Sequence, residues 1–230
     1  MNAVNWASTL AVFDLETTGI DVETSRIVTA NVSVIDADGA VLERSDWLLN
    51  PGVEIPAGAS AIHGISTERA QADGMPAGEG VGQIVERLRA VLERGLPVVA
   101  YNAPYDFTIL NREARRHGLS ALDSPTPVID PLVIDKAVDR YRKGKRTLEA
   151  AAAFYGVPLD DAHDAAADAI AAGRVAQAIA REHGAALPAS AAELHTKQVA
   201  WAAEQAASFE KYMRANRDPQ FTADGSWPER

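Results

Sequence analysis

The sequence contains no cysteine among its 230 residues, which excludes disulfide bonds and thiolate metal sites. No apolar run reaches the roughly 18 residues that a membrane-spanning helix needs. The first ten residues hold no lysine or arginine, so they do not resemble a signal peptide. These absences favour a cytoplasmic protein without a membrane segment.

Positive charge is also scarce, since 22 Lys and Arg face 32 Asp and Glu and the formal net charge is −10. This balance argues against a broad, nonspecific coating of nucleic acid. It is compatible with a nucleic acid held at a metal-loaded cleft, because bound ions supply local positive charge. With 47% hydrophobic and 23% charged residues, the composition is that of one globular domain with an appendage.

Two acids interrupt the first predicted strand, which runs from Thr9 to Leu15 and ends in a turn at Gly19. Asp14 and Glu16 are two residues apart, so on a strand their side chains share one face. Two adjacent carboxylates on a half-buried surface repel each other and need a cation, for which a divalent metal is the best candidate. The alternative is an edge strand with two solvated acids.

The remaining pattern predicts a mixed α/β fold of the RNase H-like kind, with a five-stranded sheet and helices on both faces. An antiparallel meander of three strands opens it, with a hairpin turn at 36–39, and shorter parallel strands follow. The expected strands are 9–15, 26–36, 41–49, 96–101 and 127–130; the expected helices are 81–94, 102–117, 131–138, 147–155, 164–183 and 191–213; and 56–60 and 71–80 are expected to be loop.

We expect two parts in the chain, a domain over 1–183 and a helical extension with a polar tail over 184–230. The extension carries apolar residues, among them Leu194, Trp201 and Phe209. It is therefore expected to pack on the domain or on a partner.

Two further acidic segments follow later elements. Asp106 falls in the first turn of the helix after strand 96–101, although Asn102 as a cap and Asp106 facing the helix dipole would explain both residues structurally. In the second segment, Asp164 is the expected N-cap of a helix, which leaves His163 on the preceding loop and Asp168 in the first turn. His163 and Asp168 would then line one cleft; the alternative is an acidic helix start with a solvated histidine. Asp160 and Asp161 come just before this segment.

Together these segments resemble the DEDDh exonucleases, the DnaQ-like family with an RNase H-like fold, which includes the proofreading subunit of bacterial replicative DNA polymerase. The likeness covers about 2–183 and rests on four motifs in order: 13–19 (FDLETTG), 61–65 (AIHGI), 100–106 (AYNAPYD) and 163–168 (HDAAAD). One departure is Tyr101, where many members carry histidine.

The resemblance implies a two-metal hydrolysis with Mg²⁺ or Mn²⁺, in which nucleoside 5′-monophosphates leave the 3′ end of a single strand. His163 would be the general base. The implied metal ligands are Asp14, Glu16, Asp106 and Asp168, and the implied contacts to the terminal nucleotide are Thr17, Ile62, His63, Asn102 and Tyr105. Without the motif, His63 would be interpreted as a plain core or loop histidine.

Several alternatives stay open at this point. The chain is expected to act on single-stranded DNA in proofreading or repair. The same fold also suits three alternatives: an RNA-directed exonuclease, an endonuclease with the same two-metal chemistry, and an inactive nucleic-acid-binding or scaffold protein. A polymerase partner and a homo-oligomer are both compatible with it. The basic segment 140–146 is either a solvated loop or a phosphate-binding rail for the incoming strand.

Overall fold

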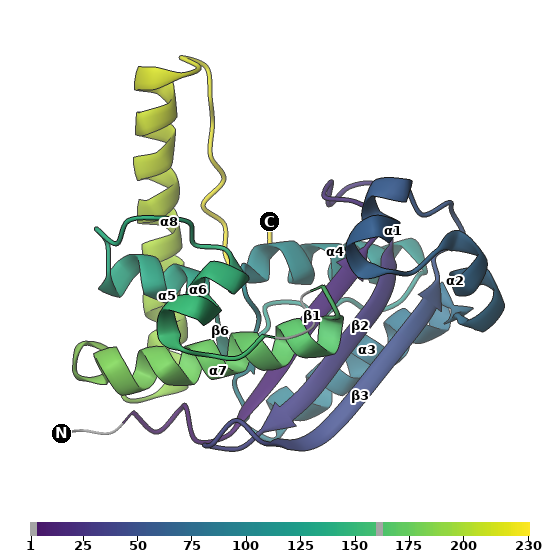
Figure 1. Cartoon of the computed structure of the whole chain (residues 1–230), viewed down its shortest axis with the longest axis horizontal. Helices are drawn as coiled ribbons and strands as arrows, with labels where there is room; N and C mark the ends of the chain where they lie inside the picture. The colour runs from purple at the N-terminus through teal and green to yellow at the C-terminus, as the bar shows by residue number, and fades with distance from the viewer. Residues whose placement is uncertain (1–3, 160–162) are drawn as a thin grey trace.

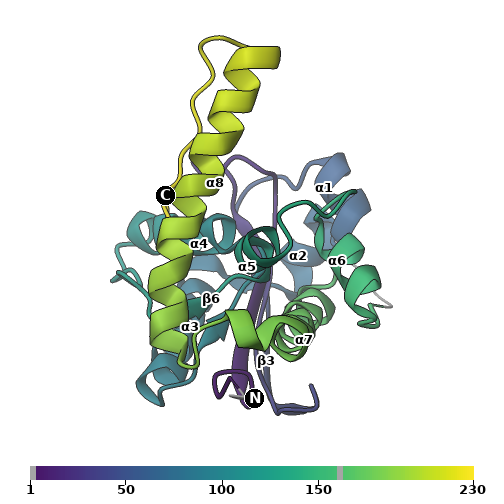
Figure 2. The same cartoon turned by 90° about the vertical axis from the view of Figure 1, so that its left-hand side faces the viewer.

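The computed structural model describes residues 4–159 and 163–230 (Figure 1). The predicted class is confirmed, because a mixed sheet carries helices on both faces. Figure 2 shows α3 (Ala77–Glu93) and α4 (Ala103–Arg116) on one side of the strands and α7 (Ala165–His183) on the other. Asp160 and Asp161 lie outside the described residues. No helix within the described ranges combines the length and the hydropathy of a membrane span.

Three long antiparallel strands form half of the sheet, as the sequence predicts. They are β1 (Leu10–Thr17), β2 (Ile27–Ile35) and β3 (Val41–Asn50), and β1 lies between β2 and the parallel strands. The register shifts between Glu16 and Thr17, where β1 ends. Such irregularities re-aim side chains near functional sites. Strand β1 is an inner strand of the sheet, and its two acids lie at its carboxyl end.

The parallel half is short but fixes the topology. Val98–Val99 (β5) pairs with β1, and Val128–Ile129 (β6) pairs with β5, both in parallel. Helix α4 follows β5 directly, and α5 (Pro131–Val138) follows β6. The carboxyl ends of β1, β5 and β6 therefore meet at one edge of the sheet, where ligands bind in open α/β folds.

The prediction of loops at 56–60 and 71–80, and of five strands, is wrong. The first stretch lies in α1 (Ala57–His63), and the second holds the end of α2 (Thr67–Asp73), a two-residue strand β4 (Met75–Pro76), which makes the sheet six-stranded, and the start of α3. Helix α3 begins at Ala77 and not at Val81. The glycines that suggested a loop serve close packing, because a Cβ at Gly80 would lie 2.8 Å from Leu49 Cγ.

The later helices match the expectation closely. Thr147 caps α6 (Leu148–Tyr155), which ends at Gly156 in the left-handed conformation. Helix α7 crosses β1 and β2 at close range, because Gly173 touches Val12 and Ile35 where any Cβ would clash. A short 3-10 turn, Gly184–Ala186, leads on to α8 (Ala191–Asn216).

Helix α8 covers the open edge of β6. Its Gln198 side chain accepts from Asp130 N at 2.7 Å and donates to Val128 O at 3.0 Å, as a neighbouring strand would. His195 Nδ1 accepts from Val128 N at 3.1 Å. The remainder of α8 projects from the domain, and the tail runs back beside it (Figure 1). The extension thus packs on the domain; the boundary at 183/184 stays a prediction.

Replacing Gln198 with leucine should lower the free energy of unfolding by about 1–3 kcal/mol, because a buried amide and a buried carbonyl of the β6 edge lose their partner. Urea unfolding followed by circular dichroism measures this change. Gln220→Leu on the exposed tail is the matched control and should change stability little. Equal stability of both variants would show that α8 does not protect the edge.

Candidate active site

The acids of β1 meet a third acid from α4. Asp106 is only 3% exposed, and its Oδ1 accepts a hydrogen bond from Leu15 N at 3.1 Å. Leu15 is the residue between Asp14 and Glu16, so this bond brings Asp106 to the acidic end of β1. The carboxylate at the start of α4 is therefore not a solvated partner of the helix dipole.

The start of α7 supplies the fourth acid and the histidine. Asp164 caps the helix as predicted, with its Oδ1 accepting from Ala166 N at 3.1 Å and Ala167 N at 3.0 Å. His163 lies on the preceding loop with φ 71°, and its backbone N donates to Asp168 Oδ2 at 3.1 Å. In this left-handed turn, a nitrogen of the exposed imidazole lies within 4.8 Å of carboxylate oxygens of Glu16 and Asp168.

Burial and mutual repulsion raise the pKa of these carboxyl groups. The pKa of Asp14 lies well above its ordinary range because the group is buried and faces Asp106 and Asp168. Burial, with Asp168 and Asp164, raises the pKa of Glu16 to about 8. Burial is also the main cause that raises the pKa of Asp106 and of Asp168. Ionising the whole cluster is therefore costly unless bound protons or an added cation offset the charge.

The donor set fits a divalent metal. Glu16, His163 and Asp168 each present a ligand atom, and these atoms lie within 4.8 Å of one another. Asp168 Oδ1 is buried and has no hydrogen-bond partner among the described residues, which leaves it free for an ion. Carboxylate oxygens suit hard ions such as Mg²⁺ and Mn²⁺.

A second group of predicted residues forms a turn beside the acids. Thr17 Oγ1 lies 2.6 Å from Tyr105 Oη, and the two hydroxyls lie 2.7 and 2.6 Å from Gly19 O, so one hydroxyl donates to the other and the second donates to Gly19 O. Tyr105 thereby ties α4 to the turn after β1. Ile62 of α1 is 57% exposed, as a residue that meets a ligand must be.

His63 is more constrained than a surface histidine. Its Nδ1 accepts from Ile65 N at 3.2 Å, so the proton of the neutral ring is on Nε2. Nε2 is buried and finds no partner within the part of the chain that the structure describes. Burial, with a smaller contribution from nearby His163, lowers the pKa of His63 and keeps the ring neutral.

The structure excludes the alternative in which the Asn102 side chain caps α4, and the contact of Asn102 with the terminal nucleotide stays a prediction. Asn102 adopts φ 63° and ψ 46°, and its side chain makes no capping bond. Asp130 takes that role, accepting from Asn102 N and Ala103 N at 3.0 Å and from Leu132 N of α5 at 2.9 Å. The exposed Asn102 side chain faces a cavity between α4, α5 and α8 instead.

Sequence analysis missed two acids near the site. Asp130 anchors the starts of both α4 and α5, and only its place before Pro131 at a helix start signals a cap. Glu149 of α6 has Oε1 3.8 Å from His163 Nε2. No local motif marks this contact, because the two residues are 14 positions apart in the sequence.

The basic segment 140–146 is partly structural. Arg142 and Arg146 both bond Asp135, which is buried, at 2.5 and 2.7 Å. Arg142 also lies over the Phe154 ring. Arg140, Lys143 and Lys145 are exposed, so only these three are free to meet a phosphate backbone.

A profile described as exonuclease, the RNase T family, matches residues 11–176. The DNA polymerase III PolC-type protein of Streptococcus thermophilus is 30% identical over 171 residues, which cover 73% of this chain and 11% of that protein. The DNA polymerase III subunit epsilon-like protein of Rhodobacter capsulatus is 32% identical over 167 residues, which cover 71% and 22%. This chain thus spans less than a quarter of these relatives.

Solved structures share the fold. Exonuclease I of E. coli in complex with a dA16 oligonucleotide aligns with a TM-score of 0.64 at 19% identity, covering 77% of this chain and 42% of that one. Exonuclease I of Methylocaldum szegediense aligns with a TM-score of 0.61 at 22% identity, covering 77% and 41%. The fold is therefore that of the RNase H-like exonucleases. With the profile match over most of its length, the chain belongs to the RNase T family of exonucleases and resembles its DEDDh members.

Glu16→Gln should stabilise the metal-free protein at alkaline pH. Since the pKa of Glu16 is raised from 4.5 to about 8, the folded state loses stability as pH rises from the lower value through the higher one. At pH 9 in chelator, the variant should be about 1–2 kcal/mol more stable, a figure discounted for the partial exposure of the carboxyl group. At pH 4 this difference should vanish.

Thermal melting across pH measures this effect, with Glu86→Gln on the exposed face of α3 as the control. Added Mg²⁺ should stabilise the wild-type protein at pH 9 and the variant less. A wild-type protein whose stability does not fall between pH 5 and pH 9 would contradict the electrostatic picture of the cluster.

Proposed function

We propose that the chain is a metal-dependent 3′→5′ exonuclease that releases nucleoside 5′-monophosphates from single-stranded nucleic acid, with DNA favoured. One observation carries the proposal: four carboxylates from β1, α4 and α7 converge, with His163 beside them and a buried Asp168 oxygen left without a partner. A buried cluster of four acids that binds no ion would destabilise the fold, and no other interaction would compensate for that cost.

Asp14, Glu16, Asp106 and Asp168 would hold two divalent ions, Mg²⁺ or Mn²⁺. Bound there, such ions supply an acidified water and neutralise charge on the attacking and leaving oxygens. His163, whose exposed ring faces the cleft from a fixed turn, would take the proton from the attacking water. Glu149, near His163 Nε2, would hold the imidazole in place.

The turn beside the acids would receive the terminal nucleotide. The hydroxyls of Thr17 and Tyr105 hold that turn rigid through Gly19, and exposed Ile62 offers an apolar surface to a base or sugar. The neutral His63 ring, whose buried Nε2 lies beside the Thr17 backbone, follows Ile62 in α1 and supports this surface. Such a preorganised pocket positions the 3′ end without reading its sequence.

The names of the relatives support DNA as the substrate and DNA replication or repair as the process. Two are DNA polymerase III proteins, and the exonuclease I structure holds an oligonucleotide. Because the chain corresponds to a small part of the polymerase proteins, association with a polymerase is a proposal, as is a homo-oligomer. An RNA-directed exonuclease is the second candidate, and an inactive scaffold is the third.

Digestion of 5′-labelled single-stranded DNA and RNA with Mg²⁺ or Mn²⁺ tests the proposal. We expect a ladder that shortens by one nucleotide at a time on DNA, and no products with chelator or with a 3′-phosphorothioate end. Cleavage of a circular strand would indicate an endonuclease. A ladder on RNA alone would favour the second candidate, and intact strands under all conditions would favour the scaffold.

A further inference from the structure

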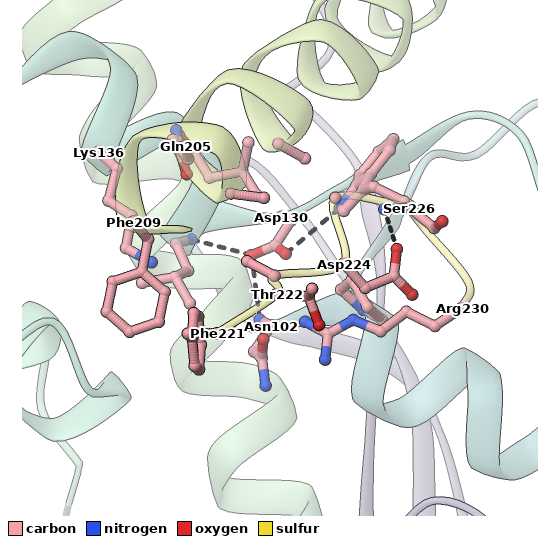
Figure 3. Close-up of a pocket in the computed structure, with 18 residues that line it drawn as sticks. Asn102, Asp130, Lys136, Gln205, Phe209, Phe221, Thr222, Asp224, Ser226 and Arg230 are labelled. Carbon is pink, nitrogen blue, oxygen red and sulfur yellow. Dashed lines mark hydrogen bonds between the residues drawn. The ribbon is translucent and has the colours of Figure 1, made fainter. Parts of the chain in front are cut away.

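A cavity of about 360 Å³ lies between the starts of α4 and α5, helix α8 and the tail (Figure 3). The first residues of α4 and α5 form its floor, and α8 and the tail 221–230 form its walls. It lies outside the carboxyl ends of β5 and β6, the same edge of the sheet at which the four acids meet. Asn102 borders it and begins the helix that carries Asp106, so the cavity and the carboxylate cluster share one helix start.

Aromatic and cationic groups line this cavity. The Phe209 and Phe221 rings pack edge to face at 5.4 Å and form an apolar wall. Lys136 and Arg230 are exposed at its rim, and their charged groups form no ion pair within the described residues. In Figure 3, the Asn102 side chain lies between Phe221 and Arg230.

Two acids also border the cavity, and neither competes strongly for an anion. Asp130 is buried, and its carboxylate accepts from three backbone amides and from Trp227 Nε1 at 3.4 Å. Asp224 is exposed, accepts from Ser226 N at 2.8 Å and lies near Arg230. The groups left free to meet a ligand are therefore a ring face, an amide and two cations.

We propose that this cavity is a second subsite for the substrate strand, which receives a nucleotide upstream of the one being cleaved; the inference rests on the proposed function. The base of that nucleotide stacks on Phe221, and Lys136 and Arg230 meet its phosphates. A basic surface with an aromatic ring is how proteins hold single strands without sequence preference. The segment 184–230 would then serve to grip the strand as well as to cover β6.

Substrate length separates this subsite from the catalytic centre. The p-nitrophenyl ester of thymidine 5′-monophosphate fills only the terminal-nucleotide site, whereas a 16-nucleotide strand reaches further. For Phe221→Ala and Lys136→Gln we expect KM for the 16-mer to rise about tenfold or more, given the size of base stacking and phosphate contacts. Hydrolysis of the ester should be unchanged.

Tyr212→Ala and Lys211→Gln, on the exposed part of α8 outside the cavity, are the matched controls and should leave KM for the 16-mer unchanged. Phe221→Tyr, which keeps a ring, should restore binding. If KM for the 16-mer rises in neither Phe221→Ala nor Lys136→Gln, the proposal is overturned. So does an equal loss on the ester and the 16-mer, since it would mean a structural role.

Binding without turnover keeps the subsite and the proposed function separable. Fluorescence anisotropy of labelled 16-mers of DNA and of RNA, with Ca²⁺ in place of Mg²⁺, measures the affinity for the strand without hydrolysis. Weaker binding by Phe221→Ala supports the subsite even if the wild-type protein hydrolyses neither substrate. The absence of hydrolysis would refute only the proposed exonuclease activity. Unchanged binding of both strands would assign the cavity to another ligand, such as a peptide, and refute the inference.

Discussion

Asp14→Asn should reduce turnover to background and remove most of the divalent-metal affinity together. Asp14 faces Asp106, Asp168 and Glu16, so it is the carboxylate most central to the cluster. The amide keeps the shape of the side chain but loses the charge that an ion needs. Titration calorimetry with Mn²⁺ and single-turnover digestion should therefore change in step.

The same substitution should raise the melting temperature of the metal-free protein at pH 8, because it removes one repelling charge from a buried group. Asp73→Asn, at the exposed end of α2, is the control and should alter neither property. Activity that survives in Asp14→Asn would exclude the carboxylate cluster as the catalytic centre. A loss caused by unfolding would appear as a lower melting temperature, opposite to the expected shift.

His163→Ala should damage the chemical step and leave metal binding largely intact. A positioned base contributes about 10²–10⁴-fold to proton transfer, so the single-turnover rate at saturating metal should fall by that range. The four carboxylates stay in place, and Asp168 loses no side-chain bond, because its contact with His163 is to the backbone N.

The pH dependence separates a base from a ligand. The wild-type rate should rise with pH, because a general base accepts a proton only in its deprotonated form, and His163→Ala should flatten this rise. His117→Ala, at the end of α4, is the control and should keep the wild-type profile. If His163→Ala loses Mn²⁺ as severely as Asp14→Asn, the imidazole is a metal ligand and the assignment of the base is wrong.

Structural features that depend only on residues close together in the sequence could be predicted. The spacing of Asp14 and Glu16 places both on one face of a strand, and Asp164 caps α7 because its carboxylate reaches amides two and three residues on. The same cap places His163 on the preceding loop, as the sequence predicts, but the left-handed conformation of His163 could not be predicted. The candidate ligands and base were therefore identified from local pattern and motif order.

Features that depend on close approach in space could not be predicted. Gly80 suggested a loop, yet it lies within α3. The helix carries a glycine there because Leu49 leaves no room for a side chain. Asp130 holds Asn102, which is 28 residues earlier, and this contact appears only when β5 and β6 are paired. Gln198 lies 70 residues after Val128, yet its side chain bonds the open edge of β6. No hydrophobic pattern in the sequence connects β6 to α8.

The structure also connects the extension to α4, the helix that carries Asp106. Asn111 of α4 donates to Glu229 Oε2 at 2.8 Å, and Thr108 Oγ1 accepts from Arg230 N at 2.9 Å. Trp227 packs on His195 of α8 at 4.9 Å between ring centroids. The tail thus contacts the helix that carries Asp106, which is why 184–230 is integral to the described structure although its motif content is low.

The most direct test of the metal site is an anomalous-scattering map from crystals soaked with Mn²⁺ and a nucleoside 5′-monophosphate. We expect two peaks within about 2.0–2.6 Å of carboxylate oxygens. Asp14, Glu16, Asp106 and Asp168 should supply those oxygens, and the phosphate should lie against the ions. A map without peaks between these side chains at saturating Mn²⁺, or with the ion elsewhere, would contradict the assignment of this cluster as the catalytic centre.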